Sequence, residues 1–224
     1  MWVKGEKIVA CVKRMFHVEH MAPDEFQAVF DVPRGTLDKL LAYERLLIDW
    51  QTRMNLVGPG TLPDIWGRHF ADSAQLSRHV EAGRHWLDIG AGAGFPGLVL
   101  AAMDWGRFTL VESVQKKCRF LQAAVDELQL SATVSIVCER IEALPTIGVE
   151  VATARAAAPL RTLFDWSLRH VRPGGVHVFP KGRNWAEEVE SSAEGFAFDL
   201  ETRDSITDPD ARILLARNLK RRSR

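Results

Sequence analysis

The stretch from Trp86 to Leu100, WLDIGAGAGFPGLVL, constrains the fold more than any other part of the chain. A short apolar run leads into a turn that holds four glycines between residues 90 and 97, and a helical pattern follows. Glycine adopts backbone conformations that other residues avoid, and it lets a ligand approach the main chain. A strand, a glycine turn and a helix in this order open many α/β sheets, which bind ligands at the carboxyl ends of their strands. We therefore expect a ligand site at this turn.

The turn fits two ligand fingerprints. Gly92, Gly94 and Gly97 satisfy G-x-G-x-x-G, which is typical of nicotinamide and flavin enzymes. Read from Asp88, the same stretch is D-x-G-x-G-x-G, which resembles the first motif of methyltransferases that use S-adenosylmethionine (SAM). A dinucleotide pyrophosphate would be repelled by the Asp88 carboxylate and would lose an amide donor at Pro96. SAM carries an ammonium and a sulfonium but no phosphate, so the nearby acid favours SAM.

Strands and helices alternate after residue 83, which predicts a parallel sheet covered on both faces. The expected fold is α/β, a Rossmann-like sheet of the class I SAM-dependent methyltransferase type with a terminal antiparallel hairpin and an N-terminal helical appendage. The expected parallel strands are 86–89, 108–112, 133–137, 149–154 and 175–179, and the hairpin strands are 196–203 and 211–218. The expected helices between them are 97–103, 115–129, 159–171 and 185–194.

Two helices precede the sheet. Apolar residues recur at the helical period from Leu37 to Met54 behind the breakers Pro33 and Gly35, and a second helix is expected over 62–80. Met15 begins a second plausible start. The predicted organisation is therefore an extension (1–14), an N-terminal helical segment (15–82), a SAM-dependent methyltransferase domain (83–219) and a basic tail (220–224).

Charge and cysteine content narrow the class of protein. The 29 basic and 29 acidic residues exclude a surface that is basic throughout, although they permit a local basic patch. Cys11, Cys118 and Cys138 form no CxxC, so we expect neither a disulfide framework nor a zinc site, and a reducing compartment suits them. His17 and His20 lack further ligands at metal spacing. No apolar run is long enough for a membrane span, and we expect a cytoplasmic protein.

Later motifs support SAM over a nicotinamide. Glu112, at the end of the second strand, can accept from two ribose hydroxyls under either interpretation. Residues 139–145 (ERIEALP) follow the third strand, where methyltransferases place an acidic turn beside the adenine. Residues 168–179 (LRHVRPGGVHVF) are similar to their turn before the fifth strand. Each signal is weak alone, and their order and spacing make the set specific.

Two motifs that are absent at the end of the fourth strand reduce the number of candidate methyl acceptors. Residues 153–159 (TARAAAP) contain neither the [D/N]-P-P-[Y/F] motif of exocyclic amino-group methylation nor a cysteine nucleophile for pyrimidine carbon 5. A ring nitrogen such as guanine N7 has an in-plane lone pair, so it needs alignment and charge compensation rather than a general base. Lys116, Arg155, Lys181 and Arg212 supply basic side chains for that purpose.

These features together resemble the RsmG (GidB) family, the guanine-N7 methyltransferases of small-subunit ribosomal RNA. The segments that carry the resemblance are 55–57 (NLV), 68–73 (RHFADS), 88–97 (DIGAGAGFPG), 116–121 (KKCRFL), 154–156 (ARA), 179–182 (FPKG) and 211–218 (ARILLARN). The resemblance implies methyl transfer from SAM to 16S rRNA in the decoding-region loop, in the 30S subunit or an assembly intermediate. We also expect a monomer that binds no membrane.

The resemblance also assigns site residues. It places Gly90, Phe95, Ile141, Glu142 and Arg155 at SAM-contacting positions, to which the glycine-turn and ribose arguments add others. The residues expected to bind SAM are Asp88, Gly90, Gly92, Gly94, Phe95, Glu112, Ile141, Glu142 and Arg155. The residues expected at the active cleft are Lys116, Arg155, Lys181 and Arg212. No metal is expected.

Several structural alternatives stay open. Arg155 could form an ion pair with Glu139 or Glu142, and Arg212 could be a surface residue. Arg68, His69, Asp72 and Ser73 favour helix capping and packing between the N-terminal helices and the sheet, with Arg68 and Asp72 as an i,i+4 pair.

Bases could stack on the aromatic residues Phe95, Trp66 or Trp185, although core packing is the more common fate of a tryptophan. The basic tail could be solvated or could hold phosphate. Two rival functions also remain: a SAM-binding ribosome assembly factor without turnover, and a small-molecule methyltransferase.

Overall fold

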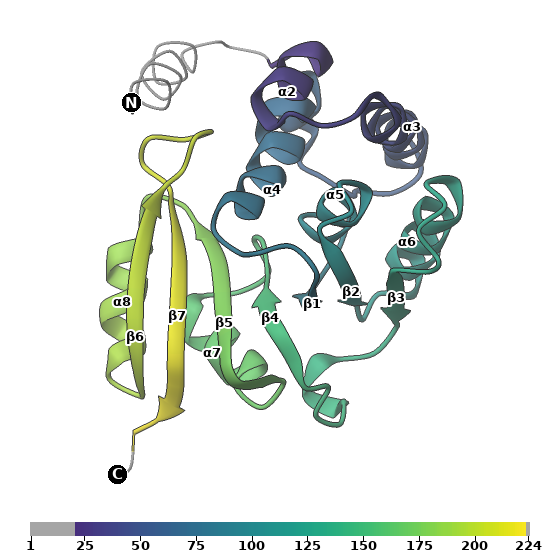
Figure 1. The fold of residues 1–224 in the computed structure, drawn as a ribbon. Coiled ribbons are helices and arrows are strands. Elements are labelled where there is room, and N and C mark those ends of the chain that lie inside the picture. The colour runs from purple at the N-terminus through teal and green to yellow at the C-terminus, as the bar shows by residue number, and fades with distance from the viewer. Residues whose placement is uncertain (1–20, 223–224) are drawn as a thin grey trace.

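The computed structural model describes residues 21–222, so the expectations for residues 1–14, His17 and His20 lie outside the described part. One seven-stranded sheet has the order β3-β2-β1-β4-β5-β7-β6 (Figure 1). Its parallel strands are β1 (Arg84–Ile89), β2 (Gly106–Val111), β3 (Val134–Val137), β4 (Val149–Thr153) and β5 (Val171–Lys181). The hairpin β6 (Phe196–Asp204) and β7 (Arg212–Arg221) adds antiparallel strands beside β5. The predicted fold class is confirmed.

Helices cover both faces of the sheet, as the alternation of strands and helices predicts. One face packs against α5 (Gly97–Ala102) and α6 (Gln115–Glu127), and the other against α7 (Leu160–Ser167) and α8 (Trp185–Ala193). Side chains alternate between the faces within a strand: Trp86 lies in the first core and Leu87 in the second. Both are fully buried, so the strands carry nearly continuous apolar runs.

The N-terminal segment departs from the two regular helices that the sequence predicts. The first predicted helix is α3 (Arg34–Gln51), but a further helix, α2 (Pro23–Phe30), precedes it. The second prediction, one regular helix over 62–80, is wrong, because this stretch is a series of short helical turns of different types. The chain passes through a 3₁₀ turn (Pro59–Asp64), a π-type turn (Trp66–Ala71), the short α4 (Asp72–Ala74) and another 3₁₀ turn (Gln75–Arg78). Pro63 removes an amide donor from this stretch.

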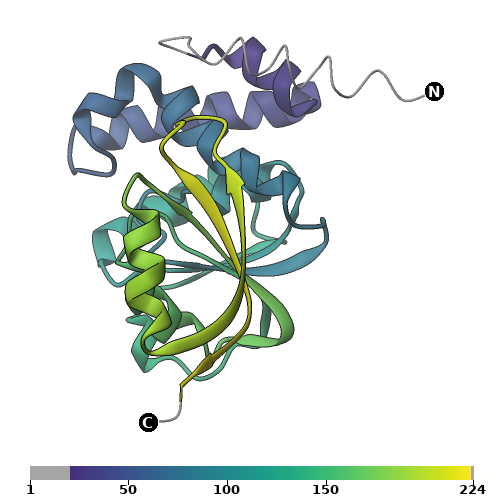
Figure 2. The same ribbon diagram turned by 90° about the vertical axis from the view of Figure 1, so that its left-hand side faces the viewer.

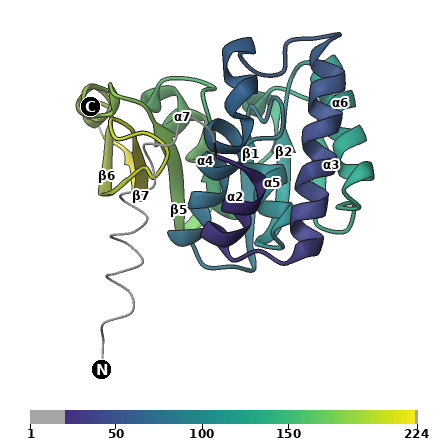
Figure 3. The same cartoon turned by 90° about the horizontal axis from the view of Figure 1, so that it is seen from above.

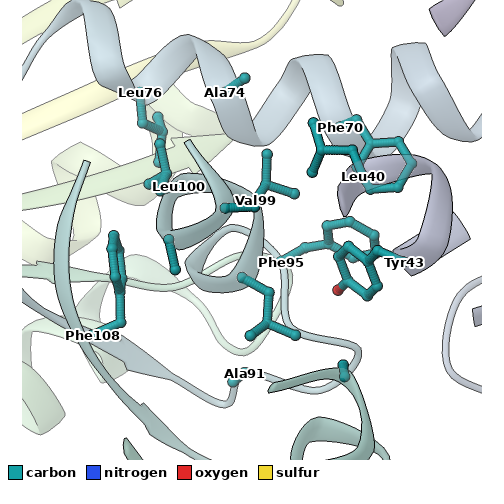
Figure 4. Packing of buried hydrophobic residues seen from close by; sticks show 14 of the residues in the cluster. Leu40, Tyr43, Phe70, Ala74, Leu76, Ala91, Phe95, Val99, Leu100 and Phe108 are labelled. Carbon is teal, nitrogen blue, oxygen red and sulfur yellow. The ribbon is translucent and has the colours of Figure 1, made fainter. Parts of the chain in front are cut away.

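The N-terminal helices share the first hydrophobic core with the sheet. Leu40 and Tyr43 of α3 are fully buried and lie in the same cluster as Val99 and Phe108 (Figure 4). Seen from above, α2, α3 and α4 lie over the parallel strands (Figure 3). The segment predicted as an appendage is therefore packed into the core that holds the glycine turn.

The hairpin loop between β6 and β7 reaches the N-terminal segment (Figure 2). Gln75 Oε1 accepts from the Ile206 amide at 2.9 Å, and Asp72 Oδ1 accepts from the Thr207 hydroxyl at 2.8 Å. Two parts of the chain more than 130 residues apart thus meet above the sheet. Their meeting encloses the space at the carboxyl ends of the central strands.

Candidate active site

The glycine turn folds back on the end of β2 and leaves its main chain open to solvent. The amides of Gly90 and Ala91 both donate to the Val111 carbonyl, at 2.9 and 3.0 Å. Gly90 and Gly92 have positive φ angles of 67° and 56°, in the region that favours glycine. A Cβ built on Gly92 would meet only the Gly90 carbonyl oxygen, at 3.7 Å. The turn therefore offers bare backbone to a ligand.

Gly97 serves packing instead. A Cβ there would lie 2.4 Å from Leu110 Cδ2 and 2.8 Å from Asp88 Oδ2, so the first residue of α5 must be glycine for the helix to lie against the sheet. The four glycines thus divide between an open surface and close helix packing.

Asp88, which was expected to lie near the SAM cation, is fully buried and is not among the residues that line the cavity. Its Oδ2 accepts from the Gly97 amide at 2.9 Å. Its Oδ1 has no partner, and burial raises the pKa of Asp88 to about 7. The carboxyl group anchors the start of α5 and thereby holds the turn in shape.

Glu112 follows β2 and is fixed by two backbone amides. Its Oε2 accepts from Gly92 at 2.9 Å and its Oε1 from Val114 at 2.8 Å. A carboxylate oxygen can accept further hydrogen bonds, so both oxygens remain able to bind hydroxyls. Glu112 is 6% exposed and stands beside the turn, outside the lining of the large cavity.

Ile141 and Glu142 form a 3₁₀ turn (Ile141–Ala143) after β3. Ile141 is buried in the second core, and the Glu142 carboxylate pairs with the Arg140 guanidinium at 3.1 Å. Arg169 Nη2 donates to both of their carbonyls, at 3.1 and 2.7 Å, which fixes the turn. The predicted adenine subsite is thus an ordered turn, also outside the large cavity.

A cavity of about 980 Å³ opens at the carboxyl ends of the central strands. The loops around it come from the N-terminal segment, the glycine turn, the β4–α7 connection, the end of β5 and the β6–β7 hairpin. Among the residues predicted for the site, those that line it are Gly90, Gly92, Phe95, Arg155, Lys181 and Arg212. Those that do not are Asp88, Gly94, Glu112, Lys116, Ile141 and Glu142. Lys116 is exposed on the first turn of α6, and its neighbour Lys117 lines the cavity instead.

Arg155 is held on the cavity wall by the N-terminal segment. Its Nη1 donates to the Arg68 carbonyl at 3.0 Å and lies 3.4 Å from Asp72 Oδ2, and its Nη2 lies 2.6 Å from His69 Nδ1. The predicted alternative, an ion pair with Glu139 or Glu142, is wrong, because the acid that pairs with Arg155 is Asp72.

The motif at 68–73 therefore packs the N-terminal segment against the sheet, as predicted. The residue of the sheet domain that it contacts through hydrogen bonds is Arg155. Asp72 pairs with Arg155 rather than with Arg68, the predicted i,i+4 partner. Ser73 is buried, and its hydroxyl donates to the His69 carbonyl at 2.6 Å.

Lys181 and Arg212, which are paired across β5 and β7, also line the cavity and have protein partners of their own. Lys181 Nζ donates to the Ala158 carbonyl at 2.8 Å and to Glu188 Oε2 at 2.7 Å, with 9% of its side chain exposed. Arg212 pairs with Asp204 at 3.3 Å and stands over the Trp185 ring. An ammonium has three donors, so Lys181 keeps one for a ligand.

The aromatic candidates for base stacking are engaged within the protein. Phe95 is 3% exposed. Its ring centroid lies 5.3 Å from that of Tyr43 and 4.8 Å from Arg155 Cζ. Trp66 is buried against Phe70, which is the core role expected of a tryptophan. Trp185 lies under Arg212.

The first residues of the predicted basic tail (220–224) belong to the last strand. β7 extends to Arg221, so Lys220 and Arg221 are strand residues. Arg221 pairs with Asp165, and Arg222 Nε donates to the Phe196 carbonyl at 3.0 Å. Lys220 is exposed, while residues 223–224 lie outside the described part.

Sequence reasoning missed three parts of the site. Tyr43 donates its hydroxyl to the Ala93 carbonyl in the glycine turn, Thr61 lies 2.7 Å from His69 Nε2, and the hairpin loop at 205–208 forms a wall of the cavity. The sequence drew attention to one member of these contacts, His69, through the motif at 68–73. Within residues 21–222, no group of three or more His, Cys, Asp or Glu side chains could hold a metal ion, and no helix could span a membrane.

Comparisons with known proteins agree on one family. A family model described as GidB, rRNA small subunit methyltransferase G, matches residues 36–214. The ribosomal RNA small subunit methyltransferase G of Paramagnetospirillum magneticum is 42% identical over 202 residues, covering 90% of this chain and 98% of its own. That of Hyphomonas neptunium is 44% identical over 199 residues, covering 88% and 95%.

Solved structures share the fold at low identity. A SAM-dependent methyltransferase from Aquifex aeolicus superposes with a TM-score of 0.55 at 14% identity, over 69% of this chain and 92% of its own. An O-methyltransferase from Bacillus cereus gives 0.54 at 15% identity, over 80% and 91%. These likenesses support the Rossmann-like methyltransferase fold.

Proposed function

The chain belongs to the GidB family, the rRNA small subunit methyltransferases G, and on that basis we propose that it methylates N7 of a guanine in 16S rRNA. It is an enzyme that transfers a methyl group from SAM to ribosomal RNA. The proposal adds the acceptor atom and the region, the decoding-region loop. The observation that carries it is an arginine held in place on the wall of the cavity that the open glycine turn also lines.

The residues beside the turn fit SAM. Gly90 and Gly92 present main chain without a side chain, and the cavity wall next to them is formed by Ala91, Ala93 and the alanines at 156–158. Glu112 holds a fixed carboxylate beside the turn for ribose hydroxyls, and the turn at Ile141 and Glu142 would hold the adenine. When bound, SAM supplies an electrophilic methyl group on a sulfonium.

The cations of the cavity suit an acceptor that has its own lone pair. Guanine N7 carries no proton, so the site needs no general base. N7 becomes positive as it gains the methyl group, so a cation beside it cannot serve by stabilising the product. Arg155 and Lys181 would instead donate to the guanine O6 edge or a neighbouring phosphate, which aligns N7 with the methyl group. Their protein contacts keep both groups in place before RNA arrives.

The further partners belong to the same proposal. The substrate is the 30S subunit or an assembly intermediate, the enzyme acts in the cytoplasm, and it acts as a monomer. Lys117 and Arg161 line the cavity, and they give its mouth additional positive charge for the RNA backbone. A base in a structured loop would have to leave its stack to reach Arg155.

Methyl transfer from labelled SAM tests the proposal directly. Purified 30S subunits that lack the modification, and naked 16S rRNA, would be incubated with the enzyme, and N7-methylguanine would be mapped by cleavage at the modified base. We expect one modified guanine in the decoding region. SAM binding without transfer would favour the assembly-factor alternative, and transfer only to small molecules would favour the other rival.

Site variants test the assigned roles. Arg155→Ala and Lys181→Ala should lower the single-turnover rate at saturating RNA and SAM far more than Lys220→Ala, which removes an exposed charge on β7. If both cavity variants keep the wild-type rate and lose only RNA affinity, the two residues belong with the phosphate-binding surface.

A further inference from the structure

His69 contacts Arg155 on one side of its ring and Thr61 on the other. Its Nδ1 lies 2.6 Å from Arg155 Nη2, and its Nε2 lies 2.7 Å from Thr61 Oγ1. The ring stacks on Phe95 with centroids 4.9 Å apart, and the residue is 7% exposed. The imidazole therefore has a defined partner at each nitrogen.

Only one arrangement of protons satisfies these contacts. A guanidinium can only donate, so Nδ1 must accept from Arg155, and the neutral ring carries its proton on Nε2. Nε2 then donates to Thr61 Oγ1, and the Thr61 hydroxyl donates to the Gly58 carbonyl at 2.7 Å. The chain of donors ends at a backbone carbonyl, and Thr61 selects the tautomer that accepts from Arg155.

The surroundings keep this imidazole neutral. Burial, followed by the positive charges of Arg155 and Arg68, lowers the pKa of His69 to about 3. The ring thus stays a neutral acceptor from about pH 5 to pH 8.

Arg155 lines the cavity, and its contacts leave some of its donors unused. A guanidinium has five N–H groups, and the bonds to Arg68, Asp72 and His69 use both of those on Nη1 and one on Nη2. The second Nη2 hydrogen and the Nε hydrogen remain. The Phe95 ring, 4.8 Å from Cζ, fixes the guanidinium plane, so the direction of the free donors is set before substrate binds.

We propose that His69 is a positioning residue for methyl transfer, a neutral acceptor whose tautomer is set by Thr61 and which aims the free donors of Arg155 at the acceptor base. This inference rests on the proposed function and on the role of Arg155 in it. It assigns a chemical task to a residue of the 68–73 motif whose evident role is packing.

Three substitutions of His69 distinguish a role in orienting the Arg155 donors from a role in packing alone. His69→Asn places an amide oxygen near the position of Nδ1, His69→Gln places its amide nearer that of Nε2, and His69→Ala removes both. We expect His69→Ala and His69→Gln to lower the single-turnover rate at saturating substrates about 10- to 100-fold, the usual range for a lost charged hydrogen bond. His69→Asn should recover to within about threefold of wild type, with KM for SAM nearly unchanged in all three.

His177 provides the matched control. It is also a buried imidazole, 3% exposed, with Nδ1 2.8 Å from Ser167 Oγ, and it lies outside the cavity lining. Its burial lowers the pKa of His177 to about 4, so it too is neutral. His177→Ala and His177→Asn remove a comparable ring, and the rate of each variant is compared at matched folded fraction. Equal rate losses in the His69 and His177 series would overturn the proposal in favour of general packing.

A second measurement does not depend on activity. Nitrogen-15 NMR of the histidine rings should show His69 as the Nε2–H tautomer without titration between pH 5 and 8, and detection of the other tautomer would overturn the proposal. His69→Ala combined with Arg155→Ala should be no slower than Arg155→Ala alone, whereas additive losses would show that His69 acts independently. A wild-type enzyme without any transfer would overturn the proposed function and the positioning role together, while a wild-type rate in His69→Ala would overturn positioning alone.

Discussion

Asp88→Asn is the substitution whose effect follows most directly from the structure. The Asp88 carboxyl group is fully buried, one oxygen accepts from the Gly97 amide, and the other has no partner. Burial raises its pKa from 3.8 to about 7, against the opposing effects of the Gly97 hydrogen bond and the positive charge of Arg155. An asparagine has nearly the same shape, keeps an acceptor for Gly97 and carries no charge at any pH.

The magnitude follows from linkage between protonation and folding. Because the folded-state pKa lies above the unfolded value, the contribution of Asp88 to stability is fully present below pH 3.8 and is lost as the pH rises through about 7. At about 1.4 kcal/mol per pH unit, this pKa difference corresponds to a loss of about 4 kcal/mol by pH 8. Asp88→Asn removes that loss. The free energy of unfolding of the variant relative to wild type should therefore rise by about 4 kcal/mol between pH 4 and pH 8. Any effect of the substitution that does not depend on pH shifts this difference equally at every pH.

Urea unfolding of both proteins at intervals from pH 4 to pH 8 measures this difference. Asp126→Asn, which replaces an exposed carboxylate on α6, is the control and should show no such widening. SAM affinity should be unchanged in Asp88→Asn, because the side chain is fully buried and asparagine keeps the acceptor that holds the Gly97 amide. A stability difference between Asp88→Asn and wild type that stays constant within about 1 kcal/mol across the range would refute the reasoning.

Four further predictions concern the turn and the RNA-binding surface. Glu112→Ala should weaken SAM binding by about 1.5–3 kcal/mol in calorimetry, and a loss below threefold would remove Glu112 from the site. Gly90→Val should abolish most SAM affinity while the fold survives, because its φ is 67° and a Cβ there already lies 3.0 Å from the Ala157 methyl; unchanged binding would contradict this. Tyr43→Phe should cost about 1–3 kcal/mol of unfolding free energy by leaving the Ala93 carbonyl without its donor, and an unchanged urea midpoint would count against the contact. Lys220→Ala should lower RNA affinity and reduce its salt slope by about 1, with SAM affinity as the unaffected control.

The sheet was predictable because its signals are local. Buried parallel strands are short apolar runs bounded by turn residues, and each strand expected from such a run matches an observed strand to within four residues at either end. The hairpin strands were also expected, and β6 and β7 pair antiparallel as predicted. Such features depend on residues close together in the chain, so one sequence suffices to find them.

The N-terminal segment was less predictable because tertiary contacts shape it. The stretch at 59–78 has a helical pattern, yet the bond from Ser73 to the His69 carbonyl and the contact of His69 with Arg155 accompany a π-type turn. The side-chain direction of Asp88 was equally hidden. The sequence places an acid beside the turn, but whether it faces the ligand or the Gly97 amide depends on how α5 packs.

The same limit applies to Arg155. Sequence proximity suggested Glu139 or Glu142 as its partner, whereas its actual partners lie 83 to 87 residues away in the chain. A single sequence does not show which residues that far apart in the chain meet in the folded protein. Contacts between distant segments are therefore the part of the site that one sequence does not show.

Asp72 shows why those distant contacts belong together. Its Oδ2 faces Arg155, while its Oδ1 accepts from Thr207 in the hairpin loop and from Gln75, which in turn holds that loop through Ile206. One carboxylate thus joins the N-terminal segment, the end of β4 and the hairpin around the cavity. Residues of the glycine turn, of the N-terminal segment and of the hairpin loop all line the one cavity. His69, Asp72 and Thr207 lie where the N-terminal segment and the hairpin loop meet at this cavity, so a change at Asp72 would act on the Arg155 guanidinium and on the hairpin loop together.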